Sequence, residues 1–243
     1  MDIRFLLLPT AACLIGLAVT GRKIGWGPFR FLFSYGPEVK KLLKSNPYED
    51  NQNRILFYGA SNFRLWTSMQ EDIREYMIVN NAFGGSTDRD LIRYSEKLLY
   101  PYHPAIVVLQ TGSNDYVRTK GSEKEILEKC YRTKLEMYDR FHAALKDTPI
   151  IILAGIVMPG REKYNGIVRQ MNAKLKDYCS GKDYLYFVDS EKLTCGDEGI
   201  RRECFVRDGI HLTPDTRKIW YREYLKPELD RIAAEYDLKE LNR

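Results

Sequence analysis

The sequence predicts an α/β protein, a three-layer α/β/α sandwich built around a five-stranded parallel sheet. Short apolar segments alternate with longer amphipathic ones from residue 54 onward. The short segments are almost continuously apolar, which is typical of parallel strands that are covered on both faces. Right-handed crossovers join such strands, so their strand-to-helix loops open at one edge of the sheet. Ligand-binding crevices form at that edge.

Strands and helices are predicted along the chain from these two patterns. The strands are expected at 55–58, 77–80, 105–110, 150–154 and 184–188. The helices are expected at 66–75, 89–99, 122–146, 164–178 and 214–236. A polar DNQN segment precedes the first strand, so residues 54–243 are assigned to one α/β domain.

The N-terminal residues 1–24 form a hydrophobic segment, in which an uncharged run at 5–21 ends at Arg22 and Lys23. A membrane span usually needs about 20 apolar residues, so this run has close to the minimum length. We interpret it as a membrane anchor, with a signal peptide or a helix docked on the domain as alternatives. This favours a membrane-anchored or exported protein over a cytoplasmic one. Residues 25–53 then form a connector.

Composition argues against nucleic-acid binding and against metal chemistry. The formal net charge is +5, and basic residues are scattered among acidic ones as on solvated helix faces, so no nucleic-acid partner is expected. The five cysteines form no C-x-x-C motif, and the chain has three histidines. No metal-ligand cluster is apparent, so we expect a reaction without a metal or another cofactor.

The first strand-to-helix turn lies in RILFYGASN, where Gly59 turns the chain and Ser61 follows at the carboxyl end of the strand. A serine at this edge of the sheet is well placed for chemistry. Taken alone, the segment is better explained as an ordinary turn, because the second glycine of a G-x-S-x-G motif is missing. Its role therefore depends on the later loops.

The second and third loops carry groups that suit a developing negative charge. Gly84 and Gly85 in NNAFGGSTDRD bring backbone amides close to a ligand, while the Ser-Thr pair after them can cap the next helix. In LQTGSNDY, Asn114 can direct its side-chain amide at an oxyanion, and Asp115 can hold the loop in shape. Each motif by itself also fits ordinary turn chemistry.

The last loop, in ECFVRDGIHLTPDTRKIW, carries Asp208 three residues before His211. A general-base histidine needs a carboxylate that fixes its tautomer and stabilises its cation, and this spacing lets the two side chains meet. His103 lies in a proline-bounded approach to a strand, and His142 lies within a long predicted helix. Both are better explained as structural residues, so His211 is the candidate base.

These loops together resemble the SGNH/GDSL hydrolase family. The matching blocks, in the family's order, are GAS at Ser61, FGGS at Gly85, GSND at Asn114, and DGIH at Asp208 and His211. The resemblance covers most of residues 54–236 and implies a flavodoxin-like α/β/α sandwich. One departure from the family pattern is Ala60, which stands where the usual GDS motif has aspartate.

The resemblance implies roles for these residues. Ser61, His211 and Asp208 would form a catalytic triad, and the backbone amides of Ser61 and Gly85 would form an oxyanion hole with the Asn114 side chain. The implied reaction is hydrolysis of acyl esters, with short acyl groups such as acetyl expected on a small-molecule or carbohydrate substrate. The alternatives are an O-acyltransferase acting on carbohydrate with the same site, and a non-catalytic ligand-binding domain of the same fold.

Three residues near the motifs are candidates for substrate binding: Arg64, Trp66 and Tyr116. Trp66 is explained at least as well by packing, and Arg64 by an interaction with a neighbouring carboxylate. Cys195 and Cys204 flank the segment just before the Asp-His loop. They are expected to form a disulfide if the domain lies outside the cytoplasm and to be free thiols if it lies inside.

Overall fold

The computed structural model describes residues 35–238 and 241 of the chain. The predicted membrane anchor at 5–21 lies outside the described residues, and within those residues no helix has the length and apolar character that a membrane span requires. The chain divides into two units, Met1–Lys41 and Leu42–Arg243, with the boundary inside the predicted connector. The described part of that connector forms helix α2 (Gly36–Ser45) and the 3₁₀ helix η3 (Tyr48–Asp50).

A five-stranded parallel sheet forms the centre of the second unit, as predicted. Its strands are β1 (Ile55–Gly59), β2 (Ile78–Asn80), β3 (Ile106–Gln110), β4 (Ile150–Leu153) and β5 (Leu185–Val188). They pair in the order β2-β1-β3-β4-β5. β1 and β3 run side by side from the Ile55–Ile106 pair to the Gly59–Gln110 pair. Their carboxyl ends are therefore level with each other.

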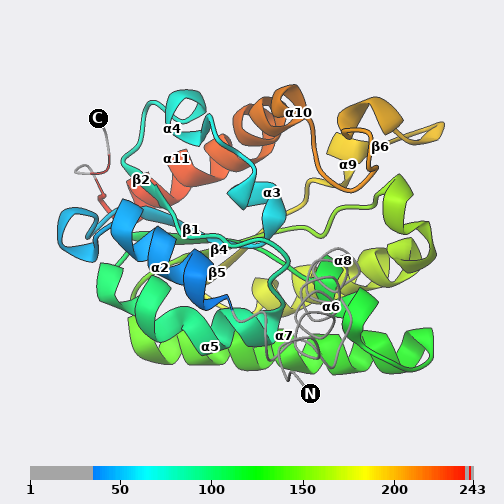
Figure 1. Cartoon of the computed structure of the whole chain (residues 1–243), viewed down its shortest axis with the longest axis horizontal. Helices are drawn as coiled ribbons and strands as arrows, with labels where there is room; N and C mark the ends of the chain where they lie inside the picture. The colour runs from blue at the N-terminus through cyan, green and yellow to red at the C-terminus, as the bar shows by residue number, and fades with distance from the viewer. Residues whose placement is uncertain (1–34, 239–240, 242–243) are drawn as a thin grey trace, which may run out of the picture. The chain divides into compact units, whose positions relative to one another are not determined.

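Two helical layers cover the sheet (Figure 1). One layer contains α3 (Ser61–Arg64), α4 (Met69–Asp72), α10 (Pro214–Ile219) and α11 (Lys226–Glu235). The other contains α5 (Asp88–Leu98), α6 (Ser113–Arg118), α7 (Glu123–Leu145) and α8 (Asn165–Ser180). The chain leaves β1 toward the first layer and β3 toward the second, so the loops after these strands diverge (Figure 1). A crevice opens at such a switch point in an open α/β sheet.

Alternating side chains of the strands pack against the two layers. Phe57 belongs to a core cluster that includes Trp220 in the first layer. Its neighbour Tyr58 points to the opposite face, where its ring lies 6.0 Å from that of Phe141 and its hydroxyl donates to the Leu91 carbonyl over 2.8 Å. The period of two along a strand thus fills both cores from one continuous apolar segment, which is why the sequence shows no polar alternation there.

Only Met69–Asp72 of the helix predicted at 66–75 is helical in the structure. The chain forms the short helices α3 and α4 instead, with a turn at Thr67 and Ser68 between them. Trp66 Nε1 and Ser68 Oγ both donate to Asp72 Oδ2, over 2.7 and 2.6 Å. A carboxylate that accepts hydrogen bonds from nearby side chains competes with regular helical hydrogen bonding. These side-chain bonds therefore stabilise the turn.

The last predicted helix, 214–236, is present but changes its winding. Between α10 and α11 lies a π-helical turn, η7 (Trp220–Leu225). Pro227 follows within the first turn of α11 and has no N–H to donate to a carbonyl of the preceding turn. A wider turn before the proline accommodates this missing hydrogen bond.

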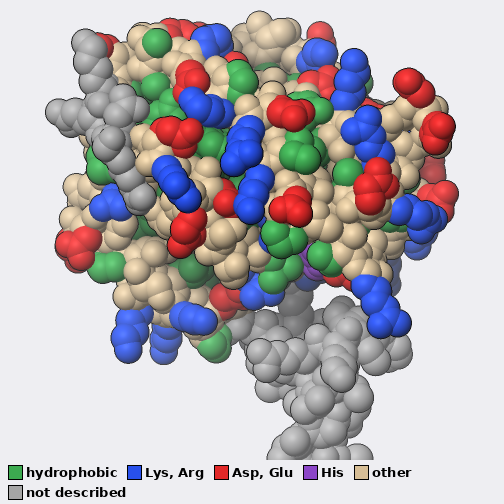
Figure 2. Space-filling model, turned by 90° about the horizontal axis from the view of Figure 1, so that it is seen from above, with side chains coloured by type: hydrophobic (Ala, Val, Ile, Leu, Met, Phe, Trp, Pro, Cys, Tyr) green, Lys and Arg blue, Asp and Glu red, His purple; other side chains and the backbone are tan. Residues whose placement is uncertain are grey.

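Smaller elements connect these layers. They are η4 (Tyr100–Tyr102), η5 (Pro159–Tyr164), α9 (Glu191–Thr194), η6 (Arg202–Cys204) and the two-stranded hairpin of β6 (Cys195–Gly196) and β7 (Gly199–Ile200). On the face viewed in Figure 2, Lys and Arg side chains intermix with Asp and Glu. On α11, for example, Arg231 pairs with both Glu228 and Glu235. Such pairs are typical of solvated helix surfaces.

Candidate active site

Ser61 is the first residue of α3 and directly follows the turn at the end of β1. Its hydroxyl lies 2.8 Å from His211 Nε2, across 150 residues of sequence. The other ring nitrogen, His211 Nδ1, lies 2.6 Å from Asp208 Oδ2. The structure therefore brings the three predicted side chains into one continuous hydrogen-bonded chain.

Asp208 is fixed by the backbone of its own turn. Its Oδ1 accepts from the N–H groups of Ile210, over 2.8 Å, and of His211, over 3.0 Å. Partial burial acts to raise the pKa of Asp208, but the hydrogen bonds from the His211 backbone and ring and from the Ile210 backbone outweigh it, and the net effect lowers the pKa. The carboxylate is therefore ionised and accepts from His211 Nδ1.

The Asp-His turn is attached to the start of α3, next to Ser61, by a residue that sequence analysis did not single out. Asn62 Oδ1 accepts from the N–H of Leu212 over 3.2 Å, and the Asn62 side chain is buried. Leu212 also forms an isolated antiparallel bridge with Phe205. The residue after the serine thus holds the residue after the histidine. An asparagine at that position was the available signal, but its partner lies 150 positions away.

Gly85 lies on the loop after β2, and Asn114 lies in the first turn of α6, which follows β3. Asn114 Nδ2 donates to the carbonyl of Ser86 over 3.0 Å, and Ser86 Oγ donates to the carbonyl of Gly59 over 3.0 Å. Gly85 has φ of 75°, a left-handed conformation that favours glycine. The Asn114 amide is therefore bonded to Ser86, the residue that directly follows Gly85, and Ser86 is in turn bonded to the end of β1.

A buried charged network supports these two loops. Asp115 Oδ1 accepts from the N–H of Asp88 over 3.0 Å, which joins the third loop to the second. Lys134 Nζ from α7 lies 3.1 Å from Asp88 Oδ2 and donates to Thr111 Oγ1 over 2.6 Å. Thr111 in turn donates to Asp88 Oδ1. We name Asp88, Thr111, Asp115 and Lys134 the buried network.

Asp115 carries the strongest electrostatic perturbation in this network. Burial raises the pKa of its carboxyl well above the ordinary value, and the negative charge of Asp88 adds to the rise. The positive charge of Lys134 and the hydrogen bond from the Asp88 backbone act in the opposite direction and are weaker. Asp115 Oδ2 is buried and has no hydrogen-bond partner among the described residues. These observations favour a protonated Asp115.

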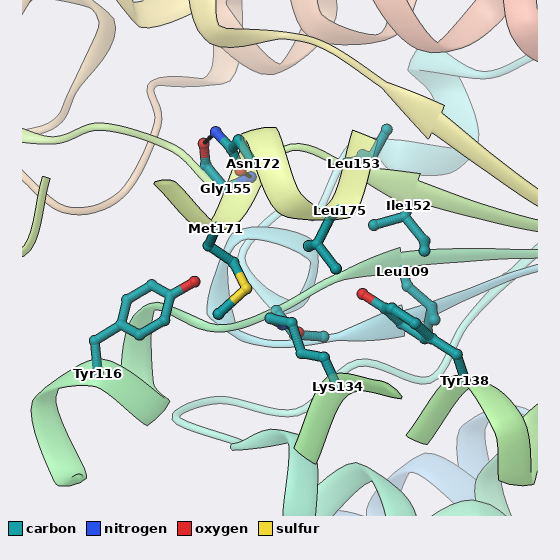
Figure 3. Close-up of a pocket in the computed structure, with 11 residues that line it drawn as sticks. Leu109, Tyr116, Lys134, Tyr138, Ile152, Leu153, Gly155, Met171, Asn172 and Leu175 are labelled. Carbon is teal, nitrogen blue, oxygen red and sulfur yellow. Dashed lines mark hydrogen bonds between the residues drawn. The ribbon is translucent and has the colours of Figure 1, made fainter. Parts of the chain in front are cut away.

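Tyr116 lies beneath the loops, where a cavity of about 10 Å³ opens between α6, α7 and α8 (Figure 3). This volume holds roughly one water molecule. The Tyr116 side chain points into it, beside Lys134, and the residue is only 2% exposed. Burial and the charge of Asp88 raise the pKa of Tyr116 well above its ordinary value. The cavity is part of the scaffold and is separate from the triad.

The other two candidates for substrate binding differ in their exposure. Trp66 is 3% exposed and its indole N–H is bonded to Asp72, which is the packing role that the sequence left open. Arg64 is exposed, and its side chain lies against Gly84, where an added Cβ would come within 2.6 Å of Arg64 Nε. Arg64 therefore borders the glycine loop, whereas Trp66 belongs to the core.

Arg161, in η5 after β4, is a second site residue that sequence analysis did not identify. Its Nη2 donates to Asn114 Oδ1 over 3.1 Å, across 47 positions of sequence. Burial lowers the pKa of the Arg161 guanidinium, with the charge of Arg118 acting in the same direction. The pattern MPGREKY shows only that a charged residue follows a turn, so the sequence carries no signal for this contact.

Cys195 and Cys204, which the sequence left open as a disulfide or as free thiols, are not bridged in the structure. Cys195 and Cys204 are both free thiols in the structure, and the Cys204 thiol donates to the Leu193 carbonyl over 3.3 Å. Within residues 35–238 and at residue 241, His, Cys, Asp and Glu side chains form no group of three that could hold a metal ion.

Solved structures of known proteins share this fold. A GDSL-like lipase from Bacteroides thetaiotaomicron is 18% identical with a TM-score of 0.61, over 82% of this chain and 96% of that one. A catalytic mutant of an acetylxylan esterase from Geobacillus stearothermophilus is 17% identical with a TM-score of 0.53, over 71% and 92%. A lipase/acylhydrolase from Enterococcus faecalis is 15% identical with a TM-score of 0.52, over 70% and 97%.

Sequence comparison supplies the family assignment. No curated protein matches the chain. The model of the GDSL-like lipase/acylhydrolase family matches residues 55–219, which include every block that suggested the resemblance. The predicted family is thereby confirmed: the chain belongs to the GDSL-like lipase/acylhydrolase family.

Proposed function

We propose that the protein is a serine esterase in which Ser61 is the nucleophile, His211 the general base and Asp208 its orienting carboxylate. The observation that carries the proposal is the hydrogen-bonded chain from Ser61 Oγ through His211 to Asp208, with distances of 2.8 and 2.6 Å. Asp208 has a lowered pKa and accepts from Nδ1, so the neutral imidazole has its free lone pair at Nε2. That nitrogen can take the Ser61 proton.

The oxyanion hole is proposed to consist of the backbone N–H groups of Ser61 and Gly85 and one N–H of Asn114 Nδ2. The first Asn114 N–H is bonded to the Ser86 carbonyl, which leaves the second for a substrate oxygen. Preorganised donors of this kind stabilise the negative charge that develops on a carbonyl oxygen. The ties from Asn114 to Ser86 and from Ser86 to Gly59 support this geometry.

The reaction proceeds in two acyl transfers. Ser61 Oγ attacks the ester carbonyl while His211 Nε2 takes its proton, and the imidazolium then protonates the departing alkoxide to release the alcohol. Water next gives a proton to His211 and attacks the acyl-enzyme, and the released Ser61 recovers its proton as the carboxylic acid leaves. The Asp208 carboxylate stabilises the imidazolium at both stages.

Hydrolysis is favoured over transfer to a carbohydrate hydroxyl by the openness of the triad. The side chains of His211 and Asp208 are 24% and 44% exposed, so water reaches the general base. A transferase needs to exclude water from its acyl-enzyme. For the substrate we propose short acyl esters, acetyl groups on carbohydrate among them, since a structural neighbour is an acetylxylan esterase. Arg64, which borders Gly84, is proposed to contact the substrate.

The experiment is hydrolysis of p-nitrophenyl esters from acetate to palmitate by the purified protein. We expect cleavage that declines with acyl length, and a loss of about six orders of magnitude in kcat for Ser61→Ala. Ser180→Ala is the matched control, because that hydroxyl is bonded to Asp177 at the end of α8. A fluorophosphonate should label the wild type and Ser180→Ala but leave Ser61→Ala unlabelled. Full activity of Ser61→Ala would disprove the proposal.

A further inference from the structure

Arg161 occupies an unusual place for a cation in this site. It holds the side-chain oxygen of Asn114, while the nitrogen of the same amide donates to Ser86. Arg161 Nη1 is buried and has no hydrogen-bond partner among the described residues. Nor does any carboxylate of the described chain lie within ion-pair distance of the guanidinium. Desolvating a cation without a direct counter-charge is costly, so its position calls for a compensating role.

The chemistry of the contact determines the orientation of the Asn114 amide. A guanidinium can only donate hydrogen bonds, and a carbonyl oxygen such as Ser86 O can only accept them. The Asn114 side chain therefore has to point Oδ1 at Arg161 and Nδ2 at Ser86. The rotated amide would place oxygen against oxygen at Ser86 and N–H against N–H at Arg161. It would also direct an acceptor at the substrate, where the proposed mechanism needs a donor.

The charge of Arg161 also acts through this contact. A cation bonded to the carbonyl oxygen of an amide draws electron density from it and makes its N–H groups stronger donors. The effect is largest where water is excluded, and both Asn114 and the guanidinium Nη1 are buried. Arg161 can thus strengthen the Asn114 N–H without touching the substrate.

The loop that carries Arg161 is held against the Asp-His turn. Gly160 N–H donates to the Gly209 carbonyl over 2.8 Å. A Cβ at Gly160 would come within 2.6 Å of the Asp208 carbonyl oxygen, so there is no space for a side chain. On the other side, Asn165 accepts from the N–H of Met158 and donates to its carbonyl, over 3.0 and 3.1 Å. Because Gly160 is bonded to the Asp-His turn and Arg161 to Asn114, this segment connects the two parts of the proposed site.

We propose that Arg161 is a positioning residue of the oxyanion hole, which fixes the orientation of the Asn114 amide and polarises it toward the transition state. This inference rests on the proposed esterase function. It predicts a loss in kcat with little change in KM, because the interaction with the oxyanion forms only in the transition state.

The test is a double-mutant cycle between Arg161→Met and Asn114→Ala, measured on an uncharged acetyl ester. Arg161→Met should lower kcat by about 10- to 100-fold. The double variant should be no slower than Asn114→Ala alone, because Arg161 acts through that amide. Arg161→Lys, which keeps a cationic donor, should recover part of the rate. Arg118→Met is the matched control. The charge of Arg118 acts on Arg161, but Arg118 forms its ion pair with Asp90, so this variant should keep the wild-type kcat.

The outcomes separate this inference from the proposed function. An inactive wild type refutes the esterase proposal itself. If the wild type is active but Arg161→Met has an unchanged kcat, the inference alone is overturned. The same holds if the loss of kcat in the double variant equals the product of the two single losses. A rise in KM at constant kcat also overturns it, because it would mean that Arg161 binds the ground-state substrate. Circular dichroism melting identifies any variant that fails to fold. If Arg161→Met does not fold, Arg161→Lys replaces it in the double-mutant cycle with Asn114→Ala.

Discussion

The general-base half of the proposed active site and its oxyanion half are stabilised in different ways. Asp208 and His211 form a partly exposed turn, and the Asp208 carboxylate is held by backbone N–H groups of that same turn. Asn114, by contrast, directly precedes Asp115 of the buried network. In that network the side chains of Asp88 and Lys134 are 0% and 3% exposed. The first half depends on local backbone geometry, and the second on charges taken out of water.

This difference separates activity from stability. A short turn whose charges face solvent contributes little free energy to folding, because exposed ion pairs are weak. Buried ions are costly when a partner is lost, because the remaining charge has no water around it. Substitutions in the general-base half should therefore abolish activity in a folded protein, whereas a substitution that leaves a buried charge of the network without its partner should first unfold it.

Among the substitutions that test this comparison, the largest effect is expected on turnover, from Asp208→Asn. The amide oxygen can still accept from the backbone of the turn, but the side chain no longer stabilises the required His211 tautomer or its cation. We expect kcat to fall by about 10⁴-fold, with a melting temperature close to that of the wild type. Kinetics on an acetyl ester and thermal melting measure the two quantities. Asp215→Asn is the control, because Asp215 is 91% exposed in the helix that follows. A large drop in melting temperature for Asp208→Asn would contradict the comparison.

The next effect is on stability, from Lys134→Met. The substitution leaves the buried Asp88 carboxylate without its cation, and we expect it to lower the free energy of unfolding by about 3–5 kcal/mol. Denaturant titration measures this loss. Lys176→Met is the matched control, because its ion pair with Asp189 has side chains that are 66% and 52% exposed. It should cost less than about 1 kcal/mol.

A second variant sharpens the same measurement. Adding Asp88→Asn to Lys134→Met removes the stranded charge and should restore part of the lost stability. Equal losses for Lys134→Met and Lys176→Met, or a double variant that is less stable than Lys134→Met, would show that the network does not stabilise the fold through its charges.

The smallest effect is a pH dependence of stability that resides in Asp115. Its pKa is raised in the folded protein, so between the ordinary carboxyl pKa and the raised one the native state binds more protons than the unfolded state. Stability from this group is therefore fully present below the ordinary pKa and decreases as pH rises, by about 1.4 kcal/mol for each unit of the shift.

Asp115→Asn should remove this dependence, because the amide cannot ionise while its oxygen can still accept from the Asp88 N–H. Urea titrations at pH 5 and pH 8 should show the variant gaining stability over the wild type as pH rises. Asp139→Asn, at an exposed position on α7, is the control and should follow the wild type. A variant that loses as much stability as the wild type between the two pH values would contradict a protonated Asp115.

The sequence by itself predicted the five strands of the parallel sheet and the residues of the proposed triad. All five strands of the parallel sheet lie where continuous apolar segments predicted them, because parallel strands buried on both faces need an unbroken apolar run. Ser61, Asn114, Asp208 and His211 could be proposed because each lies in a short motif that follows a strand or precedes the last helix, and such segments meet at one edge of a parallel sheet. The order of the motifs supplied the family.

Only the tertiary structure decided what supports those residues. Asn62, Lys134 and Arg161 act through partners that lie 150, 46 and 47 positions away, and no local pattern encodes such a distance. The burial of Trp66 and Tyr116 was also settled by packing, since an aromatic residue beside a motif suits a crevice and a core equally well in sequence. Motifs specify which groups can react, but the contacts that hold those groups in place form only when distant segments pack together.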